Sequence, residues 1–396
     1  MTITQNHRIY CSVTGSLSQD ARFRLPSEQA VKKQAQRARQ KENPVPRAPT
    51  NLADLELEED DCMSLAGEPM LQFDNKNHER RVIIFKTEKN LRALEDSSSW
   101  YVDATFSSSP QLFYQLLTIH AEIVNFNGDA TWVFPCIYIL LTHKDTPIYK
   151  EAFEALDSLG NFSPDNIMVD YELALRNALS ATFPSAQVDG CYFHLCQAVM
   201  RAVQRLGYKE EYERVTTDPT TGQKTYTPTR IWIRRLMILA YIPTADVPDA
   251  FFSILDQMPP TLDIDDLLAY FQTTWIQGLT TSSGIGRAKF PPLSWNAYDR
   301  THFHMNRTNN FVESWNKKFS AILGHSNPTI YNFITAVQRE QSSTDRKHAA
   351  YLVGENPPKR EKAHSDKVRK IHRIVQNYHS YEDDVLAYLD LLRTVM

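Results

Sequence analysis

Apolar and polar residues follow one another in a way that predicts alternating strands and helices from residue 81 onward. Short apolar runs rich in β-branched and aromatic residues predict strands, and segments with a helical period separate the later ones. The expected strands are 81–85, 101–106, 112–124, 132–142, 166–170 and 187–193. The expected helices are 87–95, 146–159, 171–182 and a further one ending near Gly207.

This order of elements predicts a fold. Three strands joined by hairpins and followed by helix, strand, helix and strand are typical of a ribonuclease-H-like fold, an α/β mixed sheet with helices on both faces. In that fold the first of the three hairpin-joined strands, here 101–106, is the neighbour of the fourth strand, here 166–170. The predicted division is an N-terminal arm with a basic helix and an acidic segment (1–80), the first part of the core (81–207), an all-helical insertion (208–300), the completion of the core (301–350) and a basic helical C-terminal tail (351–396).

Two aspartates lie where apolar strand patterns end. Asp103 follows Trp-Tyr-Val, and Asp170 follows Ile-Met-Val. Burying an unpaired carboxylate costs at least several kcal/mol, so each needs solvent, a basic partner or a cation. If their strands are neighbours, the two carboxylates converge at one edge of the sheet, where open α/β sheets bind ligands. Salt bridges and a shared metal site both remain open, and the metal site is the sharper hypothesis.

Carboxylate oxygens indicate Mg²⁺ or Mn²⁺. Mg²⁺ prefers octahedral oxygen coordination, so a third acid is expected to help hold two ions about 3.5–4 Å apart. The candidate is Glu313, which lies beside an apolar helical stripe of Phe311, Trp315 and Phe319. On position alone Glu313 is a surface glutamate in the first turn of a helix, where the helix dipole favours acids.

Composition restricts the class of protein. The chain has 396 residues, 42% of them apolar, which is enough for a large core, and its net charge of −4 excludes a globally basic protein. Five scattered cysteines favour a reducing compartment, the nucleus or the cytosol. The N-terminus lacks the pattern of a signal peptide and no apolar run is long enough to span a bilayer, so we expect neither a membrane nor secretion.

Basic residues cluster locally despite the acidic average. Such clusters can contact DNA phosphates or can simply form solvated helix faces. Ser27 is expected to cap the basic helix of the arm. The candidates for phosphate contact are Arg37, Arg39, Arg201, Arg205, Arg234, Arg235, Lys317 and Lys318.

Cys191 and His194 form a Cys-x-x-His pair, which suggests zinc. A structural zinc site needs four ligands, and this pair supplies two at most. We therefore expect no structural zinc, but a buried cysteine at a strand end and a histidine that hydrogen-bonds nearby.

Taken together, these blocks resemble the Mutator-like element (MULE) transposases. The similarity rests on Val-Asp-Ala-Thr-Phe at Asp103, Met-Val-Asp-Tyr-Glu-Leu-Ala at Asp170, Gly-Cys-Tyr-Phe-His at 190–194 and Thr-Asn-Asn-Phe-Val-Glu-Ser-Trp at 308–315, and it covers about residues 80–345. The resemblance implies a DDE-type catalytic core and reverses the position-only interpretation of Glu313.

Carried over by motif, Asp103, Asp170 and Glu313 would be the catalytic triad and hold the two metal ions, with Cys191 and His194 beside them. The expected reaction is cleavage and transfer of DNA strands in the nucleus. The expected partners are the element ends and the target DNA, with no small-molecule substrate and with homo-oligomerisation left open.

Two departures from the family pattern keep alternatives open. Ala104 stands where relatives often have glycine, and the first 80 residues lack the paired Cys/His spacing of a zinc finger. One alternative is a domesticated, non-catalytic DNA-binding or regulatory protein derived from a transposase. Another is an interaction protein whose aspartates only form salt bridges.

Overall fold

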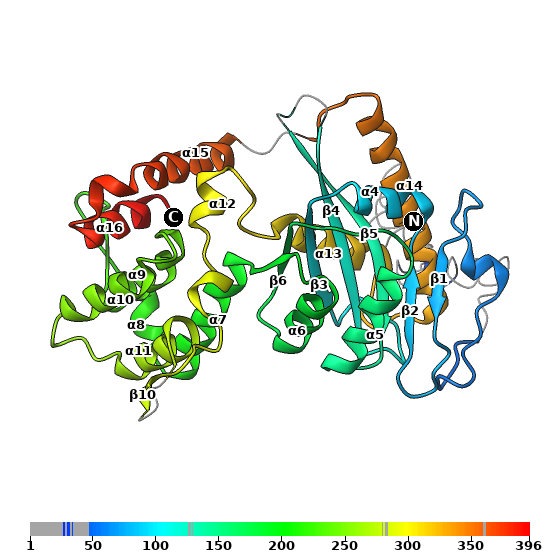
Figure 1. Ribbon diagram of the computed structural model, residues 1–396, viewed down its shortest axis with the longest axis horizontal. Helices are drawn as coiled ribbons and strands as arrows, with labels where there is room; N and C mark the ends of the chain where they lie inside the picture. The colour runs from blue at the N-terminus through cyan, green and yellow to red at the C-terminus, as the bar shows by residue number, and fades with distance from the viewer. Residues whose placement is uncertain are drawn as a thin grey trace. The chain divides into compact units, whose positions relative to one another are not determined.

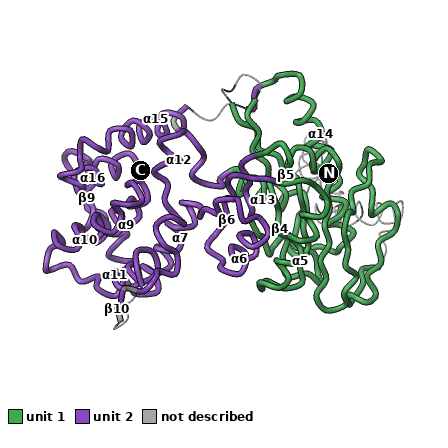
Figure 2. The backbone as a smooth tube through the Cα atoms, viewed as in Figure 1, with its two compact units in different colours: residues 1–97, 103–162, 311–355 green, residues 98–102, 163–310, 356–396 purple. Residues whose placement is uncertain are grey.

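The fold is described from a computed structural model of the chain. The structure describes residues 27, 30, 31, 34, 47–125, 128, 130–278, 280–281, 284–358 and 362–396. Compactness divides the chain into two units (Figure 2): unit 1 contains residues 1–97, 103–162 and 311–355, and unit 2 contains residues 98–102, 163–310 and 356–396. Both units therefore consist of segments that are distant in sequence.

Seven strands form one mixed sheet in the order β1-β2-β5-β4-β3-β6-β7. Their bounds are β1 Leu71–Asp74, β2 Val82–Phe85, β3 Ser99–Thr105, β4 Gln115–Val124, β5 Thr131–Leu141, β6 Asn166–Val169 and β7 Gln187–Gly190. The β1–β2, β2–β5 and β4–β5 pairs are antiparallel, whereas β3–β6 and β6–β7 are parallel. The predicted neighbourhood of the first and fourth strands of the core, β3 and β6, is confirmed.

Unit 1 covers both faces of its strands with helices, as the alternation along β4 requires. Leu116 points to one face, where it joins a core with apolar residues of α13 (Asn310–Leu323) and α14 (Ile330–Leu352). Its neighbour Gln115 points to the other face, where its amide donates to the Tyr149 hydroxyl of α5 (Thr146–Asp157) at 2.6 Å. Helix α5 lies over this second face (Figure 1).

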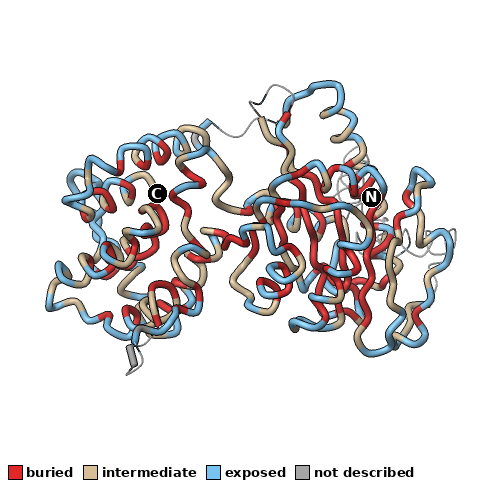
Figure 3. Tube along the Cα trace, in the orientation of Figure 1, coloured by how far each residue is buried: buried red, intermediate tan, exposed pale blue. Residues whose placement is uncertain are grey.

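Helix α4 joins the same layer as α14. It spans Glu88–Glu95, and Thr87 caps its N-terminus by accepting from the Asn90 amide. The buried side chain of Asn90 in turn exchanges hydrogen bonds with Gln341 of α14, with lengths of 2.7 and 3.0 Å. Figure 3 shows that the strands between these helix layers are almost entirely buried.

Unit 2 places helices around β6 and β7 and gathers others into a second core. Large apolar side chains that are less than 2% exposed fill this core, among them Trp275, Trp295, Tyr241 and Tyr388. The helices of unit 2 are α6 Leu173–Thr182, α7 Tyr192–Arg205, α8 Lys209–Glu213, α9 Pro228–Ile238, α10 Val247–Asp256, α11 Asp265–Phe271, α12 Tyr298–His302, α15 Lys362–Gln376 and α16 Val385–Val395. The last two helices bury Ile371, Val375, Leu389 and Leu392 in this core.

The expectation of an all-helical segment at 208–300 is wrong. Two short hairpins interrupt the helices: β8 (Val215–Thr217) pairs with β9 (Lys224–Tyr226), and β10 (Thr280–Thr281) pairs with β11 (Gly284–Ile285). The β8 and β9 residues are all exposed, so no apolar alternation marks them in the sequence. The Asp218 carboxylate forms the turn by accepting from the amides of Thr220 and Thr221, both at 2.8 Å.

One strand boundary also differs from its prediction. The strand expected over 187–193 ends at Gly190, and Phe193 already belongs to α7. The Tyr-Phe pair has the composition of a strand, but the helix begins here because Cys191 takes an extended N-cap conformation.

In the N-terminal arm, the amide of Ala30 donates to the Ser27 hydroxyl at 3.3 Å, as expected of a helix cap. Arg37 and Arg39 lie outside the described residues. In the described part of the chain, no helix combines the length and the apolarity that crossing a bilayer requires.

Candidate functional site

Asp103 lies near the end of β3 and belongs to unit 1. Its side chain is half-buried, and its Oδ2 atom accepts a hydrogen bond from Asn316 Nδ2 of α13 at 2.7 Å. The Thr118 hydroxyl on β4 donates to the backbone carbonyl of Asp103 at 3.4 Å. The first predicted acid is therefore fixed by a helix that lies more than 200 residues away in the sequence.

Glu313 lies on that same helix, one turn before Asn316. Residues three apart on a helix share a face, with about 5–6 Å between their Cβ atoms. The Glu313 side chain is half-buried, and burial raises the pKa of its carboxyl, while the nearby Lys317 opposes the shift. The structure thus brings Glu313 to the side of α13 that contacts Asp103.

The packing of α13 explains why this face is fixed. Trp315 and Phe319 are buried against the sheet, as their spacing predicts, and their rings stack 4.8 Å apart. The Trp315 indole also donates to Glu340 Oε1 of α14 at 2.9 Å. A rotation of α13 that moved Glu313 would therefore expose both rings and break this bond.

Asp170 belongs to unit 2 and follows β6 directly. Its Oδ1 atom accepts from the backbone amide of Glu172 at 3.1 Å, which turns the chain into α6. Burial lowers the pKa of His194 and the pKa of Arg176. The negative charge of Asp170 opposes the shift in both groups. The carboxylate thus lies in reach of both side chains.

Tyr171 anchors the chain next to Asp170. Its ring lies over Gly190, where a Cβ atom would come within 2.3 Å of the ring. The same ring packs edge-on against Trp275 at 4.8 Å in the core of unit 2. The glycine of Gly-Cys-Tyr-Phe-His is therefore required by close packing.

Cys191 joins the end of β7 to the residue that precedes α13. Its thiol is fully buried and donates to Asn309 Oδ1 at 3.1 Å, and the Asn309 amide donates back to the sulfur at 3.4 Å. Cys191 is thus the buried cysteine at a strand end that the sequence indicates. This pair of hydrogen bonds fixes the chain four residues before Glu313.

Clusters of side chains that bind metal ions commonly consist of three or four His, Cys, Asp or Glu residues. Within the described residues, no three or more His, Cys, Asp or Glu side chains form a group that could hold a metal ion. Within unit 1 the structure brings Asp103 together with the Glu313 face of α13, and within unit 2 it brings Asp170 together with His194. The metal-binding roles stay predictions.

The predicted phosphate-binding residues occupy different environments. Arg235 is engaged in unit 2, where it forms a two-bond ion pair with Asp390 at 2.7 and 3.0 Å. Arg201 donates to Gln197, and Arg205 lies over the Tyr270 ring. Four of these side chains are exposed, as contact with DNA requires: Arg201, Arg205, Lys317 and Lys318. Arg234 and Arg235 are half-buried.

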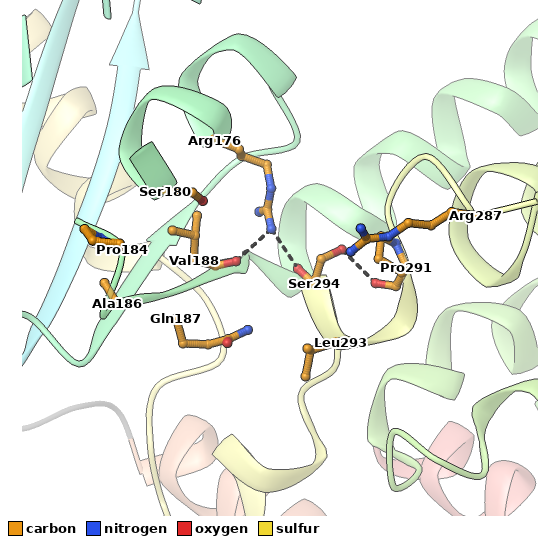
Figure 4. Close-up of a pocket in the computed structure, with 10 residues that line it drawn as sticks. All are labelled: Arg176, Ser180, Pro184, Ala186, Gln187, Val188, Arg287, Pro291, Leu293 and Ser294. Atoms are coloured by element: carbon orange, nitrogen blue, oxygen red, sulfur yellow. Dashed lines mark hydrogen bonds between the residues drawn. The ribbon is translucent and has the colours of Figure 1, made fainter. Parts of the chain in front are cut away.

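A cavity of about 310 Å³ lies in unit 2 between α6, the start of β7 and the segment around Ser294 (Figure 4). The Arg176 guanidinium crosses it and donates to the carbonyls of Val188 at 2.7 Å and Ser294 at 3.5 Å. None of the three predicted acids lines this cavity. Arg176 serves there to join two backbone segments.

Sequence reasoning missed several residues that build this site. Asn316 was not singled out, although it stands three residues after Glu313, a spacing that signals a shared helix face. Asn309 precedes the helix in the same motif. The buried ion pair of Arg300 with Asp189 carries no local signal, because its members are more than 100 residues apart.

Comparison with known families supports the resemblance found in the sequence. Residues 99–198 match the model of the MULE transposase domain. This segment runs from the start of β3 into α7 and includes Asp103, Asp170 and the Cys191–His194 pair. No curated protein matches the chain. The similarity to the MULE transposases is thereby confirmed, and the domain of a transposase implies interaction with DNA.

Proposed function

We propose that the protein is a DDE transposase that cleaves DNA strands and joins them to target DNA. The observation that carries the proposal is that the segment matching the MULE transposase domain holds Asp103 near the end of β3 and Asp170 directly after β6. These two strands pair in parallel. Asp103 and Asp170 would act with Glu313 in one site.

The register of β3 and β6 supports this grouping. Tyr101 pairs with Met168, and each aspartate follows two residues later on its own chain segment. Side chains two residues apart point to the same face of a strand. If the register continued by two residues, Asp103 and Asp170 would take equivalent positions on their strands, as the proposal requires.

The strand order supports a ribonuclease-H-like core. Strands β5, β4 and β3 are followed in the sheet by β6 and β7, both added in parallel through the helical connections α5 and α6. This is the order expected from three hairpin-joined strands followed by two crossover units. On this proposal, residues between α7 and α13 are an insertion before the glutamate.

The donor set fits Mg²⁺ or Mn²⁺. Three carboxylates offer the hard oxygen ligands that these ions prefer. Bound divalent ions would supply Lewis acidity at the attacking and leaving oxygens of a phosphodiester. The protein itself orients Asp103 through Asn316, holds α13 through Trp315 and sets the start of α13 through Cys191.

DNA would be positioned by phosphate contacts close to this site. Lys317 and Lys318 are exposed on α13, within two turns of Glu313. Lysine side chains at such positions neutralise phosphates without reading sequence. The nucleus is the proposed compartment, because that is where the proposed substrate lies.

The proposal is tested by nicking of supercoiled plasmid and joining of oligonucleotide ends, with Mg²⁺ or Mn²⁺. Asp103→Asn should lower the cleavage rate at least about 10³-fold, as loss of a catalytic group does. The control is Asp165→Asn, an exposed aspartate just before β6, which should cleave like the wild type. Metal-dependent cleavage that is equal in wild type and Asp103→Asn would refute the assignment. DNA binding without any cleavage would favour the regulatory alternative.

A further inference from the structure

We propose that Asn316 is part of the cation site: its amide nitrogen orients Asp103, and its amide oxygen is a ligand for the divalent ion. This inference rests on the proposed function and adds a residue to it. The geometry behind it lies wholly within unit 1, in the contact between α13 and the end of β3.

The hydrogen bond to Asp103 fixes the orientation of the amide group. A carboxylate accepts hydrogen bonds, so the atom that faces Asp103 Oδ2 at 2.7 Å must be the NH₂ nitrogen of Asn316. The Oδ1 atom is thereby directed elsewhere, and as a carbonyl oxygen it can only accept a hydrogen bond or bind a cation.

That oxygen is buried, and no group among the described residues donates a hydrogen bond to it. Buried acceptors without a partner are rare in folded proteins because they lose their hydration without compensation. A partner is therefore expected, and the candidates are a water molecule or a cation.

The surroundings favour a cation. The oxygen belongs to a side chain that contacts the Asp103 carboxylate and shares its helix face with Glu313. Two nearby carboxylates attract a positive charge, and amide carbonyls are regular ligands of divalent ions that prefer oxygen. Among the described residues, no three acidic, histidine or cysteine side chains form a metal site. The amide oxygen of Asn316 would add a third oxygen ligand to the carboxylates of Asp103 and Glu313 in unit 1.

The test measures binding of Ca²⁺ to the full chain without DNA, by titration calorimetry and by the rise in melting temperature. Asn316→Ala should weaken Ca²⁺ binding by about 10-fold or more, because the substitution removes both a ligand and the side chain that orients the ligand Asp103. Asn310→Ala, an exposed asparagine at the start of the same helix, is the matched control and should bind Ca²⁺ like the wild type.

A second variant separates ligand loss from loss of folding. Asn316→Asp keeps an oxygen ligand but sets two carboxylates against each other, so it should melt lower than the wild type in EDTA and gain more than the wild type from Ca²⁺. Unchanged Ca²⁺ affinity in Asn316→Ala would show that this side chain neither binds the ion nor orients Asp103 for it. An Asn316→Asp variant that gains no more from Ca²⁺ than the wild type would show that a water molecule, and not the ion, binds at this position. Either result overturns the inference.

The same titrations distinguish the inference from the proposed function. Loss of Ca²⁺ binding in Asp103→Asn, together with unchanged binding in Asn316→Ala, would leave the acidic site standing and remove Asn316 from it. A wild-type chain that binds no Ca²⁺ or Mn²⁺ at all would contradict both.

Discussion

At the scale of single residues, Gly190 is required by the close packing of the Tyr171 ring against it. A Cβ atom there would lie 2.3 Å from the Tyr171 ring, which directly follows Asp170. Gly190→Ala must therefore push the ring out of the core, and overpacking of this kind costs about 1–3 kcal/mol. We expect a corresponding fall in the free energy of unfolding, measured with urea.

A double-mutant cycle tests the cause of that loss. In a Tyr171→Ala background the ring is gone, so Gly190→Ala should cost little further. If the alanine were equally costly in both backgrounds, contact with the ring would not be the reason for glycine at this position.

His120 is a single residue that makes the free energy of unfolding depend on pH. It is buried on β4 with its ring edge-on to Trp315 at 5.1 Å, and burial lowers its pKa from 6.5 to about 3. Between these values the unfolded chain binds a proton that the folded chain does not, so this group lowers stability as pH falls below 6.5 and has no effect above it.

His120→Gln should remove that contribution. The free energy of unfolding of the variant should fall less steeply than that of the wild type between pH 6 and pH 4, by up to about 1.4 kcal/mol per pH unit. The measurement is urea unfolding across this pH range. Parallel pH profiles for the two proteins would show that His120 is protonated in the folded state as readily as in the unfolded state.

Sequence reasoning at the residue scale found the charged residues but not their partners. Asp103 and Asp170 are conspicuous because a charge ends an apolar run. Asn316 and Asn309 are neutral side chains whose role comes from contacts with Asp103 and Cys191, more than 100 positions away. Such contacts become visible only when the strands and helices have been placed.

At the scale of elements, a buried ion pair connects β7 and α12. Arg300 donates to Asp189 Oδ2 through Nε at 2.9 Å and Nη2 at 2.5 Å, and both side chains are at most 10% exposed. Removing one partner leaves a buried charge uncompensated, which costs about 3–5 kcal/mol.

Asp189→Asn should therefore destabilise the protein by about that amount in thermal or urea unfolding. The matched control is Glu154→Gln, which removes the exposed pair with Lys150 on α5 and should change stability by no more than about 0.5 kcal/mol. Similar effects of the two substitutions would mean that the Arg300 pair contributes no more than a surface pair.

The predictability of the elements follows from their burial. Strands β2 to β6 and helices α4, α5 and α6 have apolar faces that repeat with the period of the element, and their positions are predicted from the sequence to within a few residues. The β8–β9 hairpin is exposed on both strands and left no such pattern. The start of α7 was misplaced because its first residues, Tyr192 and Phe193, have the composition of a strand.

At the scale of the whole molecule, the chain crosses between its two compact units several times. Residue 103 begins a segment of unit 1, and residues 163–310 belong to unit 2 before α13 returns to unit 1. Asp103 and Glu313 thus lie in one unit and Asp170 in the other. The account requires that all three carboxylates nevertheless act on the same phosphodiester.

The most direct test of that claim compares the metal-dependent DNA cleavage rates of Asp103→Asn, Asp170→Asn and the double variant. Residues that act as one site lose activity together, so the double variant should be no slower than the slower single variant. The account predicts that each single substitution alone abolishes cleavage to this common residual rate. A single variant that cleaves DNA like the wild type, or losses that multiply in the double variant, would contradict it.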